Sequence, residues 1–201
     1  MSKVIATLTT SVDGYYTGPD DGPGNGLGTG GERLHYWVMG GPWTYKTDRD
    51  PNDSMSDVDK EFYESLTEGM GAGICGRGMY DSAGAWGGTN PFDGTLWVVT
   101  HRPEDAPDPD TGFRFVNGLD NAMEEATAAA DGKGIAIGGG GDVIRQALTA
   151  GYVDVLGIST APVVLGRGKQ LFDGFDQDLD LEIQDVFSSQ YATHTIYKVK
   201  K

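Results

Sequence analysis

Apolar and polar residues follow one another along the chain in a pattern that predicts strands and helices in turn. Residues 4–9 are apolar or β-branched throughout and predict a buried strand. Apolar residues then recur at helical spacing as Val58, Phe62 and Leu66, with Ser56 as a suitable N-cap. The same two patterns predict further strands over residues 72–75, 96–100, 113–116, 134–137 and 153–158, and helices over residues 119–126 and from Asp142.

The end of the chain departs from this alternation. Residues 181–186 and 191–199 both read as strands and predict an antiparallel hairpin around Ser188 and Ser189. Strands that alternate with helices imply βαβ units and a mostly parallel sheet, to which a hairpin can add an antiparallel edge. No internal repeat or domain boundary is found. We therefore predict a single α/β domain over residues 1–201, with a mostly parallel central sheet and an antiparallel C-terminal hairpin.

One long segment, residues 18–53, fits neither pattern because it is dense in glycine and polar residues. Such a run does not pack regularly by itself and predicts a linker or a lid. A short amphipathic piece over residues 32–39 interrupts it, with Leu34, Trp37 and Val38 as its apolar residues. We predict a glycine-rich lid inserted between the first strand and the first long helix.

Composition and charge restrict the possible functions. The 201 residues include one cysteine, which excludes a disulfide framework, and no apolar run long enough for a membrane helix. No secretory signal pattern opens the chain, so we expect a cytoplasmic protein. Its net charge of −15 disfavours binding to nucleic acid or to an anionic membrane. An anionic cofactor would have to be held by local arginines and backbone N–H groups.

The strongest candidate site is the run from Ile137 through Gly138, Gly139, Gly140 and Gly141 to Asp142 and Val143. Here a predicted strand enters a glycine turn from which a helix starts at once. Glycines let a ligand approach the backbone, and the free N–H groups of a helix start favour a pyrophosphate. The alternative is a tight turn without a ligand, although four consecutive glycines exceed what such a turn requires.

Two arginines follow predicted strands. Arg77 lies between Gly76 and Gly78, and Arg102 comes two residues after Thr100. Ligands of open α/β sheets bind at the carboxyl ends of strands, so these arginines suggest a phosphate, such as the 2′-phosphate that distinguishes NADP from NAD. The alternative is a pair of surface salt bridges.

Other chemistries lack their motifs. The histidines show no metal-ligand spacing, so we predict no metal site. There is no G-x-S-x-G element and no P-loop lysine, which disfavours serine hydrolases and nucleotide triphosphatases. Cys75 lies inside an apolar strand, which favours packing over nucleophilic chemistry.

Five segments in order, residues 6–15, 75–80, 98–102, 137–146 and 161–166, resemble the dihydrofolate reductase-like family. The similarity is greatest to the C-terminal reductase domain of the bifunctional riboflavin-biosynthesis enzyme (RibD), and covers nearly the whole chain. The insert over residues 20–35 is similar to a stand-alone bacterial branch of that family.

The resemblance implies a three-layer fold around an eight-stranded, mostly parallel sheet and an NADPH-dependent reductase that forms a homodimer. It implies that the glycine turn holds the pyrophosphate of NADPH, and that Arg77, Thr100 and Arg102 surround the adenosine end. Ala6 and Thr7 would lie near the nicotinamide. The implied reaction resembles the reduction of 5-amino-6-(5-phosphoribosylamino)uracil, in which a ribosyl group becomes a ribityl group.

The substrate side is less defined. True dihydrofolate reductases carry an acid on the helix that matches residues 56–68, but here Val58 falls near that position between Asp57 and Asp59, which argues against a folate substrate. Asp13 is the candidate catalytic residue, to orient substrate or relay a proton, with a turn-stabilising role as the alternative. A reductase that uses a deazaflavin or a pterin, and a non-catalytic nucleotide-binding domain, are the rival interpretations.

Overall fold

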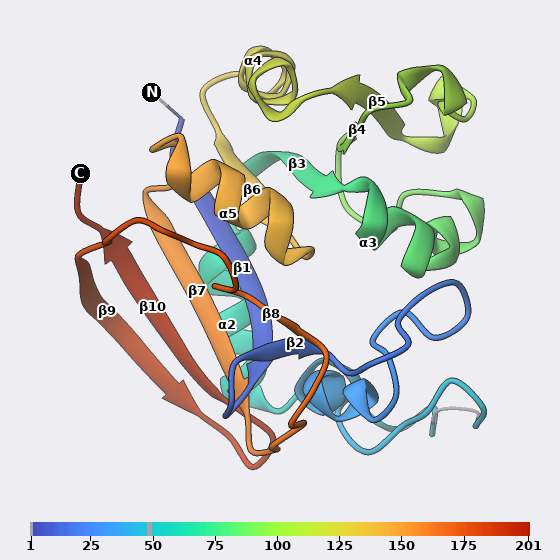
Figure 1. The fold of residues 1–201 in the computed structure, drawn as a ribbon, viewed down its shortest axis with the longest axis vertical. Coiled ribbons are helices and arrows are strands. Elements are labelled where there is room, and N and C mark those ends of the chain that lie inside the picture. Colours follow the sequence, from blue (N-terminus) through green and yellow to red (C-terminus); the bar gives the residue numbers. More distant parts are fainter. Residues whose placement is uncertain (1, 48–49) are drawn as a thin grey trace.

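The computed structural model describes residues 2–47 and 50–201. Its centre is an eight-stranded sheet of strand order β5-β4-β3-β6-β1-β7-β10-β9 (Figure 1). The strands of this sheet are β1 (Val4–Ser11), β3 (Met70–Gly76), β4 (Leu96–Thr100), β5 (Phe113–Asn117), β6 (Gly134–Gly138), β7 (Val155–Ala161), β9 (Leu181–Ser188) and β10 (Thr193–Val199).

Neighbouring strands from β5 through β7 run parallel, whereas β10 is antiparallel to both β7 and β9. The predicted mostly parallel sheet with an antiparallel C-terminal hairpin is therefore confirmed. β1 lies between β6 and β7, and six of its eight residues are buried, as expected for a central strand. The G-x-G-x-x-G string over residues 71–76 lies within β3, and only its last glycine, Gly76, reaches the junction with the following helix.

Helices cover both faces of the sheet (Figure 1). α4 and α5 pack on one face over the larger apolar core, which includes Ala6 and Ile137. α2 packs on the other face, where Phe62 and Leu66 contact a second core with Ile5 of β1. The helices are α1 (Tyr36–Met39), α2 (Asp57–Thr67), α3 (Arg77–Ser82), α4 (Leu119–Ala129) and α5 (Gly141–Thr149), with 3₁₀ turns η1 (Gly31–His35), η2 (Gly84–Gly88), η3 (Pro103–Asp105) and η4 (Pro109–Thr111).

The segment predicted as a lid packs against the sheet. It spans residues 48–49, which lie outside the described part of the chain. Leu34 of η1 is fully buried in a small cluster with Ala161 and Val163 of the segment at the end of β7. Trp37 of α1 donates a hydrogen bond from Nε1 to Thr9 Oγ1 at 3.1 Å. The predicted amphipathic piece thus exists and attaches the insertion to the carboxyl end of the sheet.

A two-stranded sheet at the same end was not predicted. β2 (Tyr15–Thr17) pairs antiparallel with β8 (Lys169–Gln170), so two segments about 150 residues apart in sequence meet beyond β1 and β7 (Figure 1). In addition, Lys169 Nζ forms an ion pair with Asp21 Oδ2 at 2.5 Å. This small sheet ties the start of the lid to the segment that follows β7.

α2 contains a buried polar network that its sequence pattern did not reveal. Ser56 caps the helix as predicted, accepting a hydrogen bond from the Asp59 backbone N–H. Asp59, rather than Val58, is the fully buried residue of the first turn; its carboxylate accepts hydrogen bonds from Ser56 Oγ at 2.6 Å and His194 Nε2 at 2.8 Å. His194 Nδ1 lies 2.7 Å from the hydroxyl of Ser159. The network joins α2 to β7 and β10 through the second core.

No helix among the described residues is long and apolar enough to cross a membrane.

Asp59→Ala is expected to lower the free energy of unfolding by about 2–4 kcal/mol, because it leaves the buried His194 N–H without its acceptor. Asp57→Ala is the matched control, since Asp57 is exposed on the same helical turn; its loss should cost no more than about 1 kcal/mol through the helix dipole. Urea unfolding of both variants measures the difference. Equal losses would show that the buried network adds nothing to stability.

Candidate active site

The residues predicted to bind a cofactor meet at one edge of the sheet. β4, β3, β6 and β1 are consecutive, parallel neighbours, so the segments that leave their carboxyl ends emerge side by side. Arg102 follows β4, Arg77 follows β3, the glycine turn follows β6 and Asp13 follows β1. With neighbouring strands about 4.8 Å apart, these segments form a continuous row along the edge.

The glycine turn adopts the conformation that its composition suggests. Gly139 and Gly140 have positive φ angles of 50° and 74°. A Cβ at Gly139 would collide with the Met79 side chain of α3, and one at Gly141 would lie 2.5 Å from the Tyr16 ring. At Gly138, in contrast, a Cβ would meet no atom within 4 Å. The turn is thus held by side chains at two positions, and its backbone stays open to approach at Gly138.

α5 begins at Gly141, one residue earlier than predicted, and its N-cap Gly140 provides no side-chain hydrogen bond. The first N–H groups of a helix lack intrahelical acceptors and carry partial positive charge. Asp142 lies in this first turn, but its carboxylate contacts residues of the next turn. Gln146 Nε2 donates a hydrogen bond to it at 2.7 Å, and Arg145 Nη2 lies 3.5 Å from it. The one acid of the first helical turn is therefore engaged by its own helix.

Arg145 is a candidate that the sequence reasoning missed. Its Nη1 donates to the Leu171 carbonyl at 2.9 Å and lies 3.2 Å from where a Cβ of Gly141 would be. The guanidinium thus places a positive charge beside the start of α5. Helical side chains lean toward the N-terminus, so an arginine four residues after the last glycine was the available signal.

The predicted site residues on β1, β6 and α5 differ in how accessible their side chains are. Ala6, Ile137 and Val143 are buried in the main core, so their side chains support the turn rather than face a ligand. Thr7 is only partly buried and lies in register with Gly138. The Thr7 side chain and the open side of Gly138 therefore share the face of the sheet that α2 covers farther along.

The two arginines come together around one carboxylate. Arg77 Nε pairs with Asp81 at 2.8 Å, and its Nη1 lies 3.3 Å from Asp105 Oδ2. Arg102 Nε lies 3.5 Å from the same oxygen. Thr100 is buried, and its hydroxyl accepts a hydrogen bond from the Arg102 backbone N–H at 3.1 Å. The adjacent glycines leave room, since a Cβ at Gly78 would meet nothing within 4 Å and one at Gly76 would meet only Val143.

Asp13, in the loop after β1, is hydrogen-bonded to the loop that follows β7. One carboxylate oxygen accepts hydrogen bonds from Ser11 Oγ at 2.6 Å and the Leu165 N–H at 3.1 Å, and the other accepts the Gly166 N–H at 2.7 Å. The Ser11 bond, followed by those backbone bonds, lowers the pKa of Asp13 to about 2. Asp13 is thus ionised at neutral pH and holds the segment after β7 against the end of β1.

Two titratable side chains of the lid, Arg33 and His35, lie in η1. Arg33 donates to the Gly30 carbonyl at 3.0 Å. Burial lowers the pKa of His35 to about 4, so its imidazole is neutral at pH 7.

Cys75 is buried in the core, and burial raises the pKa of its thiol to about 12, which fits packing rather than nucleophilic chemistry.

The two acids beside Val58 on helix α2 lie in different surroundings. Asp59 is fully buried and already accepts hydrogen bonds from Ser56 and His194, while Asp57 is exposed to solvent. The carboxylate nearest to the position expected of a dihydrofolate reductase is thus committed to the core.

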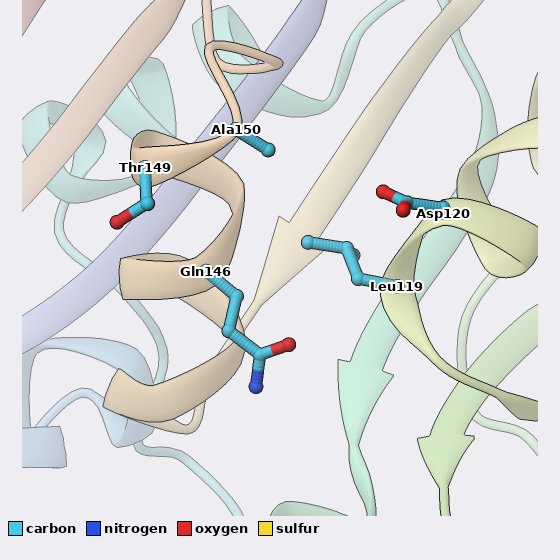
Figure 2. A pocket seen from close by; sticks show the side chains of 5 residues that line it. All are labelled: Leu119, Asp120, Gln146, Thr149 and Ala150. Carbon is cyan, nitrogen blue, oxygen red and sulfur yellow. The ribbon is translucent and has the colours of Figure 1, made fainter.

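Two surface hollows lie away from this edge. One, of about 270 Å³, lies between α4 and the C-terminal half of α5, where the Leu119 side chain points from α4 toward α5 (Figure 2). The other, of about 490 Å³, lies beside the end of β10 and includes Glu182 and Lys200. Neither contains the arginines or the glycine turn. Within residues 2–47 and 50–201, no group of three or more His, Cys, Asp or Glu residues is placed to hold a metal ion.

The family model of the RibD C-terminal domain matches residues 2–197. The chain belongs to this family. The resemblance drawn from the five motifs is therefore confirmed, and the glycine turn and both arginines fall within the matched region of this RibD C-terminal domain.

Solved structures confirm the dihydrofolate reductase-like fold. A Shewanella sp. PV-4 protein assigned by name to riboflavin biosynthesis has 22% identity and a TM-score of 0.73, with 99% of each chain covered. Dihydrofolate reductase from Enterococcus faecalis, complexed with NADP(H), has 16% identity and a TM-score of 0.56, with 99% of this chain and 97% of that chain covered.

A third solved structure is that of a diaminohydroxyphosphoribosylaminopyrimidine deaminase/5-amino-6-(5-phosphoribosylamino)uracil reductase from Thermotoga maritima. It has 12% identity and a TM-score of 0.61; the alignment covers 99% of this chain and 57% of that longer chain. No curated protein sequence matches this chain.

Stability is expected to fall as the pH drops from 6.5 toward 4. Burial lowers the pKa of His35 to about 4 and also lowers that of His194, so in this window the unfolded chain binds protons that the folded chain does not. His35→Gln should make the fall shallower, while His101→Gln, at an exposed position, should leave it unchanged. Thermal unfolding at successive pH values measures the slopes. A His35→Gln profile that matches the wild type would show that His35 does not contribute.

Proposed function

We propose that this chain is an NADPH-dependent reductase that resembles the 5-amino-6-(5-phosphoribosylamino)uracil reductase of riboflavin biosynthesis. The observation that carries the proposal is the row at the carboxyl edge of the sheet: two arginines, a glycine turn with an uncapped helix start, and the partly buried Thr7 beside it. Membership of the RibD C-terminal domain family supports it independently.

The residues of the row fit a dinucleotide. The uncapped start of α5 and the open backbone at Gly138 suit a pyrophosphate, whose charge Arg145 would help to balance. Arg77 and Arg102 follow β3 and β4, one and two strands away from β6, and suit the 2′-phosphate, which would require Asp105 to leave its position between them. Thr7, next to Gly138 on the other side, would adjoin the nicotinamide.

The proposed reaction adds a hydride and a proton across a C=N or C=O bond of a small polar heterocycle or its sugar. In the reduction of 5-amino-6-(5-phosphoribosylamino)uracil, which serves as the model, this addition converts a ribosyl group to a ribityl group. NADPH, when bound, would supply the hydride. The chain's own task is to hold both partners and exclude water. Its lid is suited to this because η1 and α1 are packed against the ends of β1 and β7.

Asp13 has a positioning task in this proposal. Its carboxylate holds the backbone of Leu165 and Gly166 against the end of β1, where the substrate would lie next to Thr7. A pKa of about 2 makes it a poor proton donor at neutral pH, so we assign it to orientation rather than proton relay.

NADPH should quench the fluorescence of the four tryptophans at lower concentrations than NADH does. Arg77→Ala should weaken NADPH binding by about 10- to 100-fold, since it removes a charge-assisted contact to the 2′-phosphate, and should change NADH binding by less than about twofold. Arg114→Ala, an exposed arginine on the neighbouring β5, is the matched control and should change neither. Fluorescence titration gives the dissociation constants.

The outcomes separate the candidate functions. Unchanged selectivity in Arg77→Ala would refute the 2′-phosphate assignment. Selective NADPH binding without oxidation of NADPH by the ribosylaminouracil precursor would favour a non-catalytic nucleotide-binding domain or another substrate. No binding of either dinucleotide would contradict the reductase proposal itself.

A further inference from the structure

Asp105 closes the space between the two arginines of the candidate phosphate site. Its Oδ2 lies 3.3 Å from Arg77 Nη1 and 3.5 Å from Arg102 Nε, so one carboxylate oxygen bridges two guanidinium groups that come from different strands. An oxygen of a bound phosphate would make the same two contacts. The protein thus supplies an internal anion at the position where an external one would bind.

Arg77 is held in place independently of Asp105. Its Nε pairs with Asp81 at 2.8 Å, and its guanidinium carbon lies 5.0 Å from the centre of the Phe115 ring. Its side chain is 22% exposed. These contacts keep the terminal nitrogens of Arg77 pointed at Asp105 and available to any anion that replaces it.

The side chains of Arg102 and Asp105 are more exposed to solvent than that of Arg77. The Arg102 side chain is 62% exposed and that of Asp105 is 39% exposed. Ion pairs exposed to this degree contribute little net stability, so a phosphate dianion can displace the carboxylate. A ribose with free hydroxyl groups carries no charge to compete for the arginines, and the carboxylate can stay where it is and accept a hydrogen bond.

We propose that Asp105 is a specificity-determining residue that weakens the preference of this site for a 2′-phosphorylated adenosine. The inference rests on the proposed function, because it takes Arg77 and Arg102 as the phosphate-binding pair. It adds that the wild-type selectivity for NADPH over NADH is held below what the two arginines alone would give. The cause is that binding of the phosphate must first release Asp105, whereas binding of an unphosphorylated ribose need not.

The test uses the intact protein, calorimetric titration and two probes that differ by one phosphate, adenosine 2′,5′-bisphosphate and adenosine 5′-monophosphate. Asp105→Asn should bind the bisphosphate about three- to tenfold more tightly than the wild type, because it removes one negative charge beside the phosphate. Binding of the monophosphate should change by less than about twofold. Glu104→Gln is the matched control: it removes the same charge from the same exposed turn, and Glu104 forms no ion pair with a described residue.

The outcomes distinguish the inference from the function on which it rests. Equal bisphosphate affinities in Asp105→Asn and Glu104→Gln would overturn the role of Asp105, even if the wild type prefers NADPH. Tighter binding of both probes in Asp105→Asn would also overturn it, since the effect would then not depend on the 2′-phosphate. A wild type that binds neither probe nor NADPH would refute both proposals.

Discussion

The N–H groups at the start of α5 are the feature on which the site depends. A helix leaves its first N–H groups without intrahelical acceptors, and the N-cap Gly140 has no side chain to satisfy them. The surrounding fold keeps this arrangement in place: β6 delivers the chain between β3 and β1, and Met79 and Tyr16 pack against the turn from either side. Glycine is required where these contacts and the positive φ angles leave no room for a side chain.

Because the protein is strongly acidic, the ion pairs of the arginines in the candidate site determine how an anion could bind there. In a chain with a net charge of −15, each of the three candidate phosphate-binding arginines already has an acidic partner: Arg77 and Arg102 share Asp105, and Arg145 has Asp142. An anionic ligand therefore exchanges with carboxylates of the protein rather than meeting free cations. The affinity of such a site would be set by how readily each carboxylate is released. Asp105 lies 3.3 and 3.5 Å from its two arginines and should be released more easily than Asp81, which pairs with Arg77 at 2.8 Å.

The sequence pattern was sufficient to predict the mostly parallel sheet and its long helices, because the central strands are short apolar runs and the helices carry apolar residues every three or four positions. β6, the glycine turn and α5 were predictable together for this reason. Asp59 was not, since a carboxylate on an apolar helix face is buried only when a partner arrives, and His194 lies 135 residues away in sequence. The pairing of β2 with β8 was likewise hidden, because strands of three and two residues show no period. The ion pairs of Asp105 were not predictable either, because they form only when the turn after β4 lies beside the end of β3.

The most direct test is an NMR titration of the backbone amides with NADPH. If the uncapped helix start binds the pyrophosphate, the amide signals of Gly141, Asp142 and Val143 should shift strongly and saturate together, while those at the start of α2, where Ser56 already caps the helix, should stay in place. Saturation of binding without shifts at residues 141–143 would contradict the account and would place the cofactor elsewhere on the protein.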